Sequence, residues 1–531
     1  MKAAVVIVGG GAGAAAAALR LTQRGIRPLV LDVGQRPDSD PPLSENWYDL
    51  RRKDSQQADY LIGSSGESLR NLYLDYLTPK LKGPRFRFVL RGGIHSPLVG
   101  EGFYPLQSFS LGGLANAWGA GVYRYTQDDL AEFPLGEAEL APYYDRLTTE
   151  MGVSGEADDL LPFFGAAEGL QPPFPLDPIG SALAKGYSKR RVFFNEHGVS
   201  VGRPRLAILS KPMGDRPACP RDNLCFWQPW LPSIYTPAYT LMRLSREGRI
   251  DYQPGRLAVS FSQNEEGVAI RTRSLIQKEA EQIFHARYVL LAAGTLNSAR
   301  IVLASRRDHV STLPLLENTT SLTPFFYPPL FGTPIAKESH GLIQLNLIYN
   351  GLAWPERVQG SFYGYSSLLL SEILSRIPLA ARSALGVGKY LPSALGILQL
   401  FYPDHAHPKK TVRWAQEGAL HVACHVRPTL GAVEKEMVRL FRSLGFLSSS
   451  FLVQYPPPGN GIHYAGTLPM KAHPSGPYET SSSGQLSFAP RVFVADASVF
   501  PRLPAKNHTM TLMALAMRAA NRVADQLKGL S

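Results

Sequence analysis

The stretch that decides the fold is AAVVIVGGGAGAAAAALRLTQRGIRPLVLD, residues 3–32. Residues 3–8 form a short apolar run, typical of a buried strand. A glycine-rich turn follows, and residues 15–24 are rich in alanine, which has the highest helix propensity. After Gly25, residues 28–32 read as a second strand that ends in Asp32. The order strand, tight turn, helix, strand and acid predicts an α/β nucleotide-binding unit.

The turn matches the pattern Gly-x-Gly-x-x-Ala through Gly9, Gly11 and Ala14. Gly9 permits the turn, Gly11 lets the backbone approach a pyrophosphate, and Ala14 lets the helix pack closely on the sheet. The helix N-terminus attracts phosphates, and Asp32 is placed to accept hydrogen bonds from ribose hydroxyls. The pattern therefore predicts an adenine dinucleotide site. A second register through residues 11–13 is open, but the distance from the strand favours Gly9 and Gly11.

A second segment of nucleotide-site character lies at the other end of the chain. Residues 491–496 predict a strand that ends in an acid, and after a turn a helix is expected to run to about Leu527. Either Asn507 or Thr509 is expected to cap that helix. A helix N-terminus beside a flavin ring would stabilise negative charge on the reduced ring.

Five blocks, in this order along the chain, resemble the glucose–methanol–choline (GMC) oxidoreductases, which are FAD enzymes that oxidise alcohols. The blocks are residues 6–11 with 31–34, 112–119, 292–298, 463–470 and 496–511. The resemblance is poor over residues 310–450. It implies an α/β chain: a Rossmann-like FAD domain of the glutathione-reductase type with an interleaved α+β substrate domain built on an antiparallel sheet. The FAD domain is expected over 1–40, 100–125, 240–310 and 485–531, and the substrate or cap domain over 126–239 and 311–484.

The same resemblance implies which residues meet the cofactor. Residues 112–119 would pass the diphosphate and the ring, with Trp118 as a wall and Leu257 near the adenine. Some relatives tether FAD through a histidine in this loop, but Ala117 stands at that position, so noncovalent FAD is expected. The expected cofactor-binding residues are Gly9, Gly11, Ala12, Gly13, Ala14, Asp32, Val33, Gly112, Gly113, Asn116, Ala117, Trp118, Gly119, Leu257, Ala293, Gly294, Asp496, Ala497, Thr509 and Met510.

The expected catalytic residues are His463, Asn507 and His508. Removing hydride from an alcohol carbon requires loss of the hydroxyl proton, and a histidine suits that base role. By resemblance His463 is the base and hydride passes to flavin N5, giving an aldehyde or ketone. The family places a histidine or asparagine beside this base to hold the substrate oxygen. Asn507 is favoured for that role, and His508, where many relatives have proline, is the alternative.

The substrate and the electron acceptor stay open at this stage. The Leu-rich middle of the chain favours a bulky or apolar alcohol, such as a biosynthetic intermediate, with a sugar or glycoside as the alternative. Either O₂ or another acceptor would reoxidise the flavin. A non-oxidative lyase is compatible with the same fold. A third class, an FAD-stabilised protein without catalysis, is disfavoured by His463 and the 507–508 pair.

The composition excludes several other classes. Apolar residues make up 44% and charged residues 18% of the 531 residues, so disorder is excluded as the main state. The net charge of +12 is dispersed, and no motif supports nucleic-acid binding. The three cysteines form no disulfide framework, zinc pattern or iron–sulfur set, so no metal is expected.

The sequence also bears on membranes and location. Residues 1–2 precede the first strand directly, without the apolar core of a signal peptide, and no run of 18 apolar residues occurs. A cytoplasmic, unprocessed protein is therefore expected. Residues 366–401 predict two short apolar helices with basic flanks, at 368–377 and 391–400. These helices would form a buried hairpin, roof an apolar pocket, or make a peripheral contact with a membrane surface.

Overall fold

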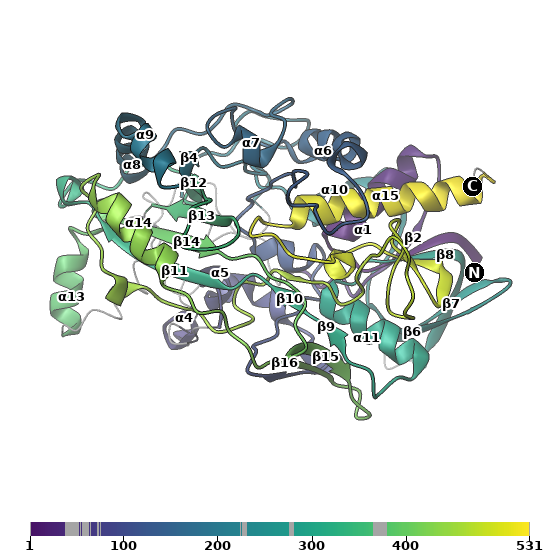
Figure 1. Ribbon diagram of the computed structural model, residues 1–531. Coiled ribbons are helices and arrows are strands. Elements are labelled where there is room, and N and C mark those ends of the chain that lie inside the picture. The colour runs from purple at the N-terminus through teal and green to yellow at the C-terminus, as the bar shows by residue number, and fades with distance from the viewer. Residues whose placement is uncertain are drawn as a thin grey trace.

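The computed structural model describes residues 2–37, 53, 55, 63, 65–71, 74, 76–223, 225, 231–275, 281–364 and 380–529. Its first layer is a mixed sheet with a parallel centre at the end of the molecule that holds both termini (Figure 1). The parallel strands, in spatial order, are β19 (Ala489–Val494), β8 (Gln282–Leu291), β1 (Lys2–Val8), β2 (Leu29–Leu31) and β5 (Asp251–Gln253). The sheet is completed by antiparallel strands β18 (Gln485–Leu486), β7 (Gly267–Ser274) and β6 (Arg256–Asn264).

Helices from the two ends of the chain pack together beside this sheet. They are α1 (Ala12–Gln23) and α15 (Thr509–Leu527), which lie side by side (Figure 1). Residues 14–18 of α1 are all alanine and almost fully buried, so the neighbouring backbone can approach closely. Arg20 donates a hydrogen bond to Asn521 Oδ1 at 2.6 Å and so joins the two helices. The close contact depends on the small side chains of α1.

The second layer is a five-stranded antiparallel sheet at the opposite end of the molecule (Figure 1). Its strands, in spatial order, are β11 (Thr320–Phe326), β14 (Leu395–Phe401), β13 (Val358–Tyr363), β12 (Ile343–Tyr349) and β4 (Val199–Gly202). One face of the sheet packs on α8 (Pro178–Lys189) and α14 (Ala432–Arg442) through a core that includes Phe325, Phe362 and Leu398. The mixed α/β fold with an antiparallel sheet, expected from the sequence, is confirmed.

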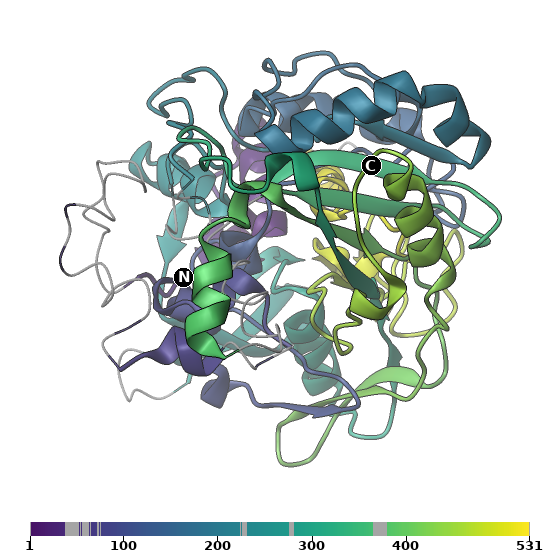
Figure 2. The same cartoon turned by 90° about the vertical axis from the view of Figure 1, so that its left-hand side faces the viewer.

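One expected element is wrong. Residues 391–400 were expected to form an apolar helix, but they form η5 (Pro392–Ala394) followed by strand β14. A short apolar run does not distinguish a helix from a buried strand, and here pairing with β11 and β13 on both sides decides it. The other expected helix, 368–377, lies outside the described residues. Figure 2 looks onto this end of the molecule, with α13 (Ala381–Gly388) in front.

Smaller elements connect the two layers. A four-stranded sheet consists of β3 (Leu98–Glu101), β16 (Leu420–Cys424), β15 (Lys410–Trp414) and β9 (Leu313–Pro314), and a two-stranded one of β10 (Leu316–Glu317) and β17 (Tyr464–Ala465). The remaining helices are α4 (Glu67–Asn71), α5 (Pro79–Lys82), η1 (Pro84–Leu90), η2 (Gly93–His95), η3 (Gly113–Ala117), α6 (Glu137–Met151), α7 (Leu161–Phe164), α9 (Arg191–Glu196), α10 (Pro237–Arg246), α11 (Thr295–Arg306), η4 (Pro328–Leu330), η6 (Ser450–Leu452) and η7 (Ala497–Val499). Within the described ranges, no helix is both long and apolar enough to cross a bilayer. The domain boundaries expected from the sequence stay a prediction.

Candidate active site

A cavity of about 840 Å³ takes its walls from both sheets. The parallel sheet contributes residues 8–13, Asp32 and residues 292–295, all at the carboxyl ends of its strands. The antiparallel sheet contributes alternate residues of β11, β13 and β14, and His463 lies between the two sets. Ligands of open α/β sheets bind at this edge of the sheet, so the cavity is the candidate active site.

The glycine turn at the nucleotide end of the cavity is tightly built. Gly9 has a φ of 110°, and a Cβ there would stand 2.4 Å from the carbonyl oxygen of Ala292. A Cβ on Gly13 would stand 1.9 Å from the carbonyl oxygen of Ala495. The close approach of helix and sheet therefore depends on Gly13, a role that we had expected of Ala14. A Cβ on Gly11 would have no neighbour within 4 Å, so the backbone there faces open space.

Asp32 and a second glycine loop, at Gly112 and Gly113, enclose the nucleotide end of the cavity. The hydroxyl of Tyr252 donates a hydrogen bond to Asp32 Oδ2 at 2.9 Å, and burial raises the pKa of Asp32 to about 7. The backbone N–H of Gly112 donates to the carbonyl oxygen of Gly10 at 2.9 Å. A Cβ on Gly113 would stand 3.4 Å from the Cα of Gly11. The two glycine loops are therefore in contact.

Trp118 is fixed in the cavity wall from both ends. Its indole Nε1 donates to the carbonyl oxygen of Tyr235 at 3.1 Å, and its own carbonyl oxygen accepts from Lys80 Nζ at 2.8 Å. Ala117, one residue earlier, lines the cavity with a methyl group that cannot form a bond to a cofactor. This loop offers a rigid wall at the position where we expected the flavin ring.

His463 is oriented by a residue that we did not predict. Its Nδ1 lies 3.0 Å from Oδ1 of Asn318, which is fully buried. Asn318 Nδ2 donates to the carbonyl oxygens of Tyr402 and Pro504, at 2.8 and 3.0 Å, so the amide oxygen must face the imidazole. An amide oxygen only accepts, and His463 therefore carries its hydrogen on Nδ1. Nε2 thus presents its lone pair as the acceptor that can take a proton, and its contact with Asn507 is long.

Asn507 faces this ring nitrogen. Its Oδ1 accepts a hydrogen bond from the backbone N–H of Thr509 at 2.9 Å. The amide nitrogen Nδ2 is therefore turned towards His463 and lies 3.5 Å from Nε2. The N-cap residue of α15 is His508, so the prediction that either Asn507 or Thr509 is the N-cap was wrong. The Asn507 side chain nevertheless bonds to the first turn.

The two histidine rings pack edge to face, with centroids 5.1 Å apart. His463 also stacks on Phe401, with centroids 5.2 Å apart. Nδ1 of His508 is buried without a hydrogen-bond partner in the part of the chain that the structure describes. Burial lowers the pKa of His463 to about 4 and that of His508 well below its usual value, so both rings are neutral near pH 7.

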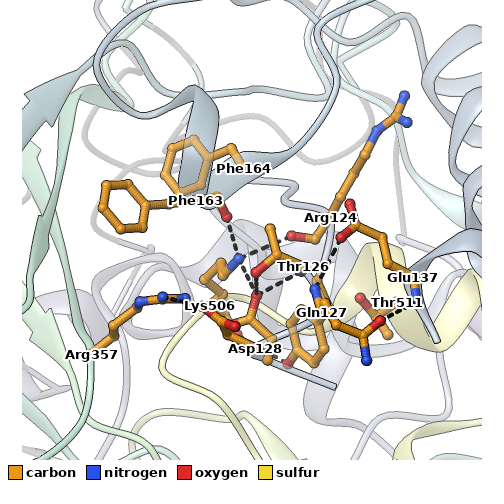
Figure 3. A network of polar contacts seen from close by, with 12 residues as sticks. Arg124, Thr126, Gln127, Asp128, Glu137, Phe163, Phe164, Arg357, Lys506 and Thr511 are labelled. Atoms are coloured by element: carbon orange, nitrogen blue, oxygen red, sulfur yellow. Dashed lines mark hydrogen bonds and ion pairs between the residues drawn. The ribbon is translucent and has the colours of Figure 1, made fainter. Parts of the chain in front are cut away.

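A buried polar network around Lys506 anchors the turn that carries Asn507 and His508 (Figure 3). Lys506 is 2% exposed, and its Nζ pairs with Asp129 and donates to the carbonyl oxygens of Arg124 and Phe163. Asp129 also accepts from the backbone N–H and the hydroxyl of Thr126, at 2.8 and 2.9 Å. The network ties the segment before α15 to residues 124–163. No sequence motif predicted it.

The cavity wall includes most of the predicted site residues, but not Ala14, Asn116 or Met510. Ala14 and Met510 are buried in the core. The Asn116 side chain donates to Ser110 Oγ and to the carbonyl oxygen of Leu111, at 2.9 and 2.8 Å, and so holds the second glycine loop. The Asp496 carboxylate lines the cavity but accepts from the backbone N–H of Gly294 at 2.9 Å, and thereby ties the ends of β19 and β8 together.

Sequence reasoning missed the polar residues of the antiparallel sheet. Gln359 of β13 and Gln399 of β14 line the cavity, as does Gln454 beside β11. The only signal was the alternation of side chains in residues 395–401, which we had interpreted as part of a helix. With strand pairing known, the alternation places these side chains on one face.

The chain is similar to known oxidoreductases. Residues 457–516 match the family model described as GMC oxidoreductase. A C-glycoside 3-oxidase from Arthrobacter globiformis is 27% identical over 268 residues, which are 46% of this chain and 47% of that protein. The fructose dehydrogenase large subunit of Gluconobacter japonicus is 24% identical over 263 residues, 47% of this chain and 44% of that protein. The chain thus spans about half the length of the curated relatives that it matches.

A solved structure extends the likeness to the whole chain. The crystal structure of pyridoxine 4-oxidase from Mesorbium loti has a TM-score of 0.60 at 14% identity, and the match covers 98% of this chain and 99% of that one. At this identity the likeness shows the fold. The sequence match at the C-terminal end is to the GMC oxidoreductases, so this part of the chain resembles that family.

Proposed function

We propose that the protein is an FAD-dependent oxidoreductase that oxidises an alcohol to an aldehyde or ketone. The observation that carries this proposal is one cavity that joins a glycine-lined nucleotide end to the pair His463 and Asn507. The proposal is supported by the match of residues 457–516 to the GMC oxidoreductases and by two similar proteins that are named as a sugar dehydrogenase and a glycoside oxidase.

The nucleotide end fits FAD. The N-terminus of α1 and the open backbone at Gly11 would hold the pyrophosphate. The Asp32 carboxylate would accept hydrogen bonds from the ribose hydroxyls. Trp118 would face the ring, and Ala117 provides no atom for a covalent link, so the cofactor would be held noncovalently. When bound, FAD would accept the hydride that leaves the substrate carbon.

The protein residues would handle the proton and the oxygen. His463 Nε2 would take the hydroxyl proton, because Asn318 keeps the ring hydrogen on Nδ1. Asn507 Nδ2 would donate a hydrogen bond to the same substrate oxygen, since it lies 3.5 Å from Nε2. The low pKa of His463 would keep the base unprotonated down to about pH 5.

His508 remains the alternative partner for the substrate oxygen. It lines the cavity, and its buried Nδ1 has no hydrogen-bond partner among the residues that the structure describes, so a bound group would satisfy it. The acceptor that regenerates the oxidised cofactor is O₂ or another electron acceptor. Cytoplasmic location and peripheral contact of residues 366–401 with a membrane stay hypotheses.

The first test is an absorption spectrum of the purified protein, before and after anaerobic addition of an alcohol panel. We expect flavin bands, release of the flavin by acid, and bleaching by one class of alcohol. The variants His463→Ala and Asn507→Ala should keep the bound flavin and lose bleaching, whereas His421→Ala on β16, which does not line the cavity, should behave as the wild type. Absence of flavin after reconstitution would refute the proposal. Turnover with persistently oxidised flavin would favour a lyase.

A further inference from the structure

The face of the antiparallel sheet that lines the cavity changes character along its strands. On β14, Leu395, Ile397, Gln399 and Phe401 face the cavity and are half-buried. The alternate residues of the same strand, at 396, 398 and 400, are buried on the opposite face. The strand thus presents four side chains to the cavity, at intervals of about 6.8 Å.

The first two rows of this face lie next to the catalytic end, and we call them the polar rows because they carry the glutamines, beside the apolar side chains of Phe401 and Leu322. Phe401 stacks on His463 and pairs across strands with Gln359, so the first row lies beside the proposed general base His463. In the second row Gln399 pairs with Ser361 of β13. Gln454 joins this row, because its backbone bridges to Leu322, the partner of Gln399 on β11.

The next two rows are apolar. Ile397 pairs with Tyr363 on one side and Pro324 on the other, and Leu395 pairs with Phe326. Beyond them the cavity is lined by the apolar side chains of Leu447 and Leu452, each close to half-exposed, and we call this rim the mouth of the cavity. The mutual backbone hydrogen bonds of Leu447 and Phe326, at 2.7 and 2.8 Å, put this mouth at the apolar end.

Gln359, in the polar rows, has a buried polar atom whose missing hydrogen-bond donor a ligand could supply. The residue is 2% exposed, and within the described part of the chain its buried Oε1 has no hydrogen-bond partner. A buried amide oxygen in that state is costly unless a bound molecule donates to it. A ligand that carries several hydroxyls can satisfy this oxygen and the neighbouring amides at once.

We propose that the preferred substrate is a two-part alcohol, with a polyhydroxylated ring over Gln359, Gln399 and Gln454 and an apolar body over Ile397, Leu395 and Phe326. The reacting hydroxyl belongs to the ring, because the polar rows adjoin His463. The apolar body begins at the third row, about 14 Å from the first row, which is two row spacings. This inference rests on the alcohol oxidation proposed above and assigns the residues that select its substrate.

The experiment compares three probes: glucose as the ring alone, benzyl alcohol as the apolar body alone, and phenyl β-glucoside as both. Anaerobic bleaching of the holoenzyme's flavin gives the reduction rate for each. Calorimetry with FAD-loaded His463→Ala gives each dissociation constant without turnover. We expect phenyl glucoside to bind at least tenfold more tightly than either half.

Two substitutions on the same strand separate the two subsites. In the FAD-loaded His463→Ala background, Gln399→Leu should weaken the binding of glucose and phenyl glucoside about tenfold to a hundredfold and leave the binding of benzyl alcohol unchanged. Ile397→Asn should weaken only phenyl glucoside and benzyl alcohol, by about tenfold. Gln359→Leu is the second test of the polar subsite if Gln399→Leu binds less FAD than the parent.

The outcomes distinguish the two proposals. If no alcohol bleaches the wild-type flavin, alcohol oxidation itself fails. If bleaching occurs but the three probes bind equally, or if Gln399→Leu and Ile397→Asn weaken the same probes, oxidation stands and the two-part substrate is refuted. Tighter binding of benzyl alcohol than of phenyl glucoside would also overturn the inference.

Discussion

The buried ion pair between Asp129 and Lys506 predicts how much one substitution should change the free energy of unfolding. The substitution Asp129→Asn removes the negative charge and leaves the Lys506 ammonium, whose side chain is 3% exposed, among neutral oxygens that include the carbonyls of Arg124 and Phe163 (Figure 3). Breaking a buried ion pair by removing one partner costs about 3–5 kcal/mol. We therefore expect the free energy of unfolding of Asp129→Asn to fall by about that amount.

The neighbouring residue provides a matched control. Asp128 pairs with Arg357, but its side chain is 70% exposed. Exposed pairs contribute about 0–1 kcal/mol, so Asp128→Asn makes the same chemical change with little effect on stability. The measurement is urea unfolding of the holoenzyme, followed by tryptophan fluorescence, for wild type and both variants.

The pH dependence identifies the buried ammonium as the cause. Burial lowers the pKa of Lys506, and the Asp129 carboxylate opposes that shift. Without the carboxylate the folded-state pKa falls further below the unfolded value of 10.5. The unfolded chain then binds the proton that the folded protein releases, so the stability of Asp129→Asn should rise with pH, by up to about 1.4 kcal/mol per unit.

Activity provides a second readout, because Asn507 follows Lys506 directly. A displaced catalytic group costs about tenfold to a hundredfold in rate, and we expect such a loss in flavin reduction by Asp129→Asn. Replacing both partners, as in Asp129→Leu with Lys506→Met, should restore stability above that of Asp129→Asn alone. Equal stability of Asp129→Asn and Asp128→Asn, with no change between about pH 7 and about pH 9, would refute the reasoning.

Four further outcomes follow from the site. Asn318→Leu should lower kcat about tenfold to a hundredfold with little change in KM, because nothing then holds the ring hydrogen of His463 on Nδ1. An unchanged kcat would contradict the orienting role of Asn318. The pKa of His463, lowered to about 4, predicts that kcat/KM stays level from about pH 5 to about pH 8 and falls only as the pH drops through 4; an acid limb near 6.5 would contradict it. Gly13→Ala places a Cβ 1.9 Å from a carbonyl oxygen and should lower the FAD content, whereas Gly386→Ala, in open space, should not. Replacing Asn507 by alanine should slow flavin reduction more than His508→Ala does, and the reverse order in stopped-flow traces would make His508 the partner.

Part of the site was readable from the sequence because its signals are local. The glycine pattern and Asp32 lie within one continuous strand, turn, helix and strand, and a tight turn needs glycine wherever it occurs. His463 and Asn507 were found through family blocks that contain them. Residues 391–400 were misread, because an apolar run of that length fits both a helix and a strand, and only the pairing with β11 and β13 decides it.

The sequence by itself therefore determined the nucleotide-binding fold, the family resemblance and the candidate base. The tertiary structure alone decided which way that base points, because Asn318 is fixed by carbonyl groups that come from two distant segments. It also decided what anchors the turn before α15 and which glutamine side chains line the cavity. These features depend on strand register and on charges brought together in the interior, and no local spacing along the chain encodes them.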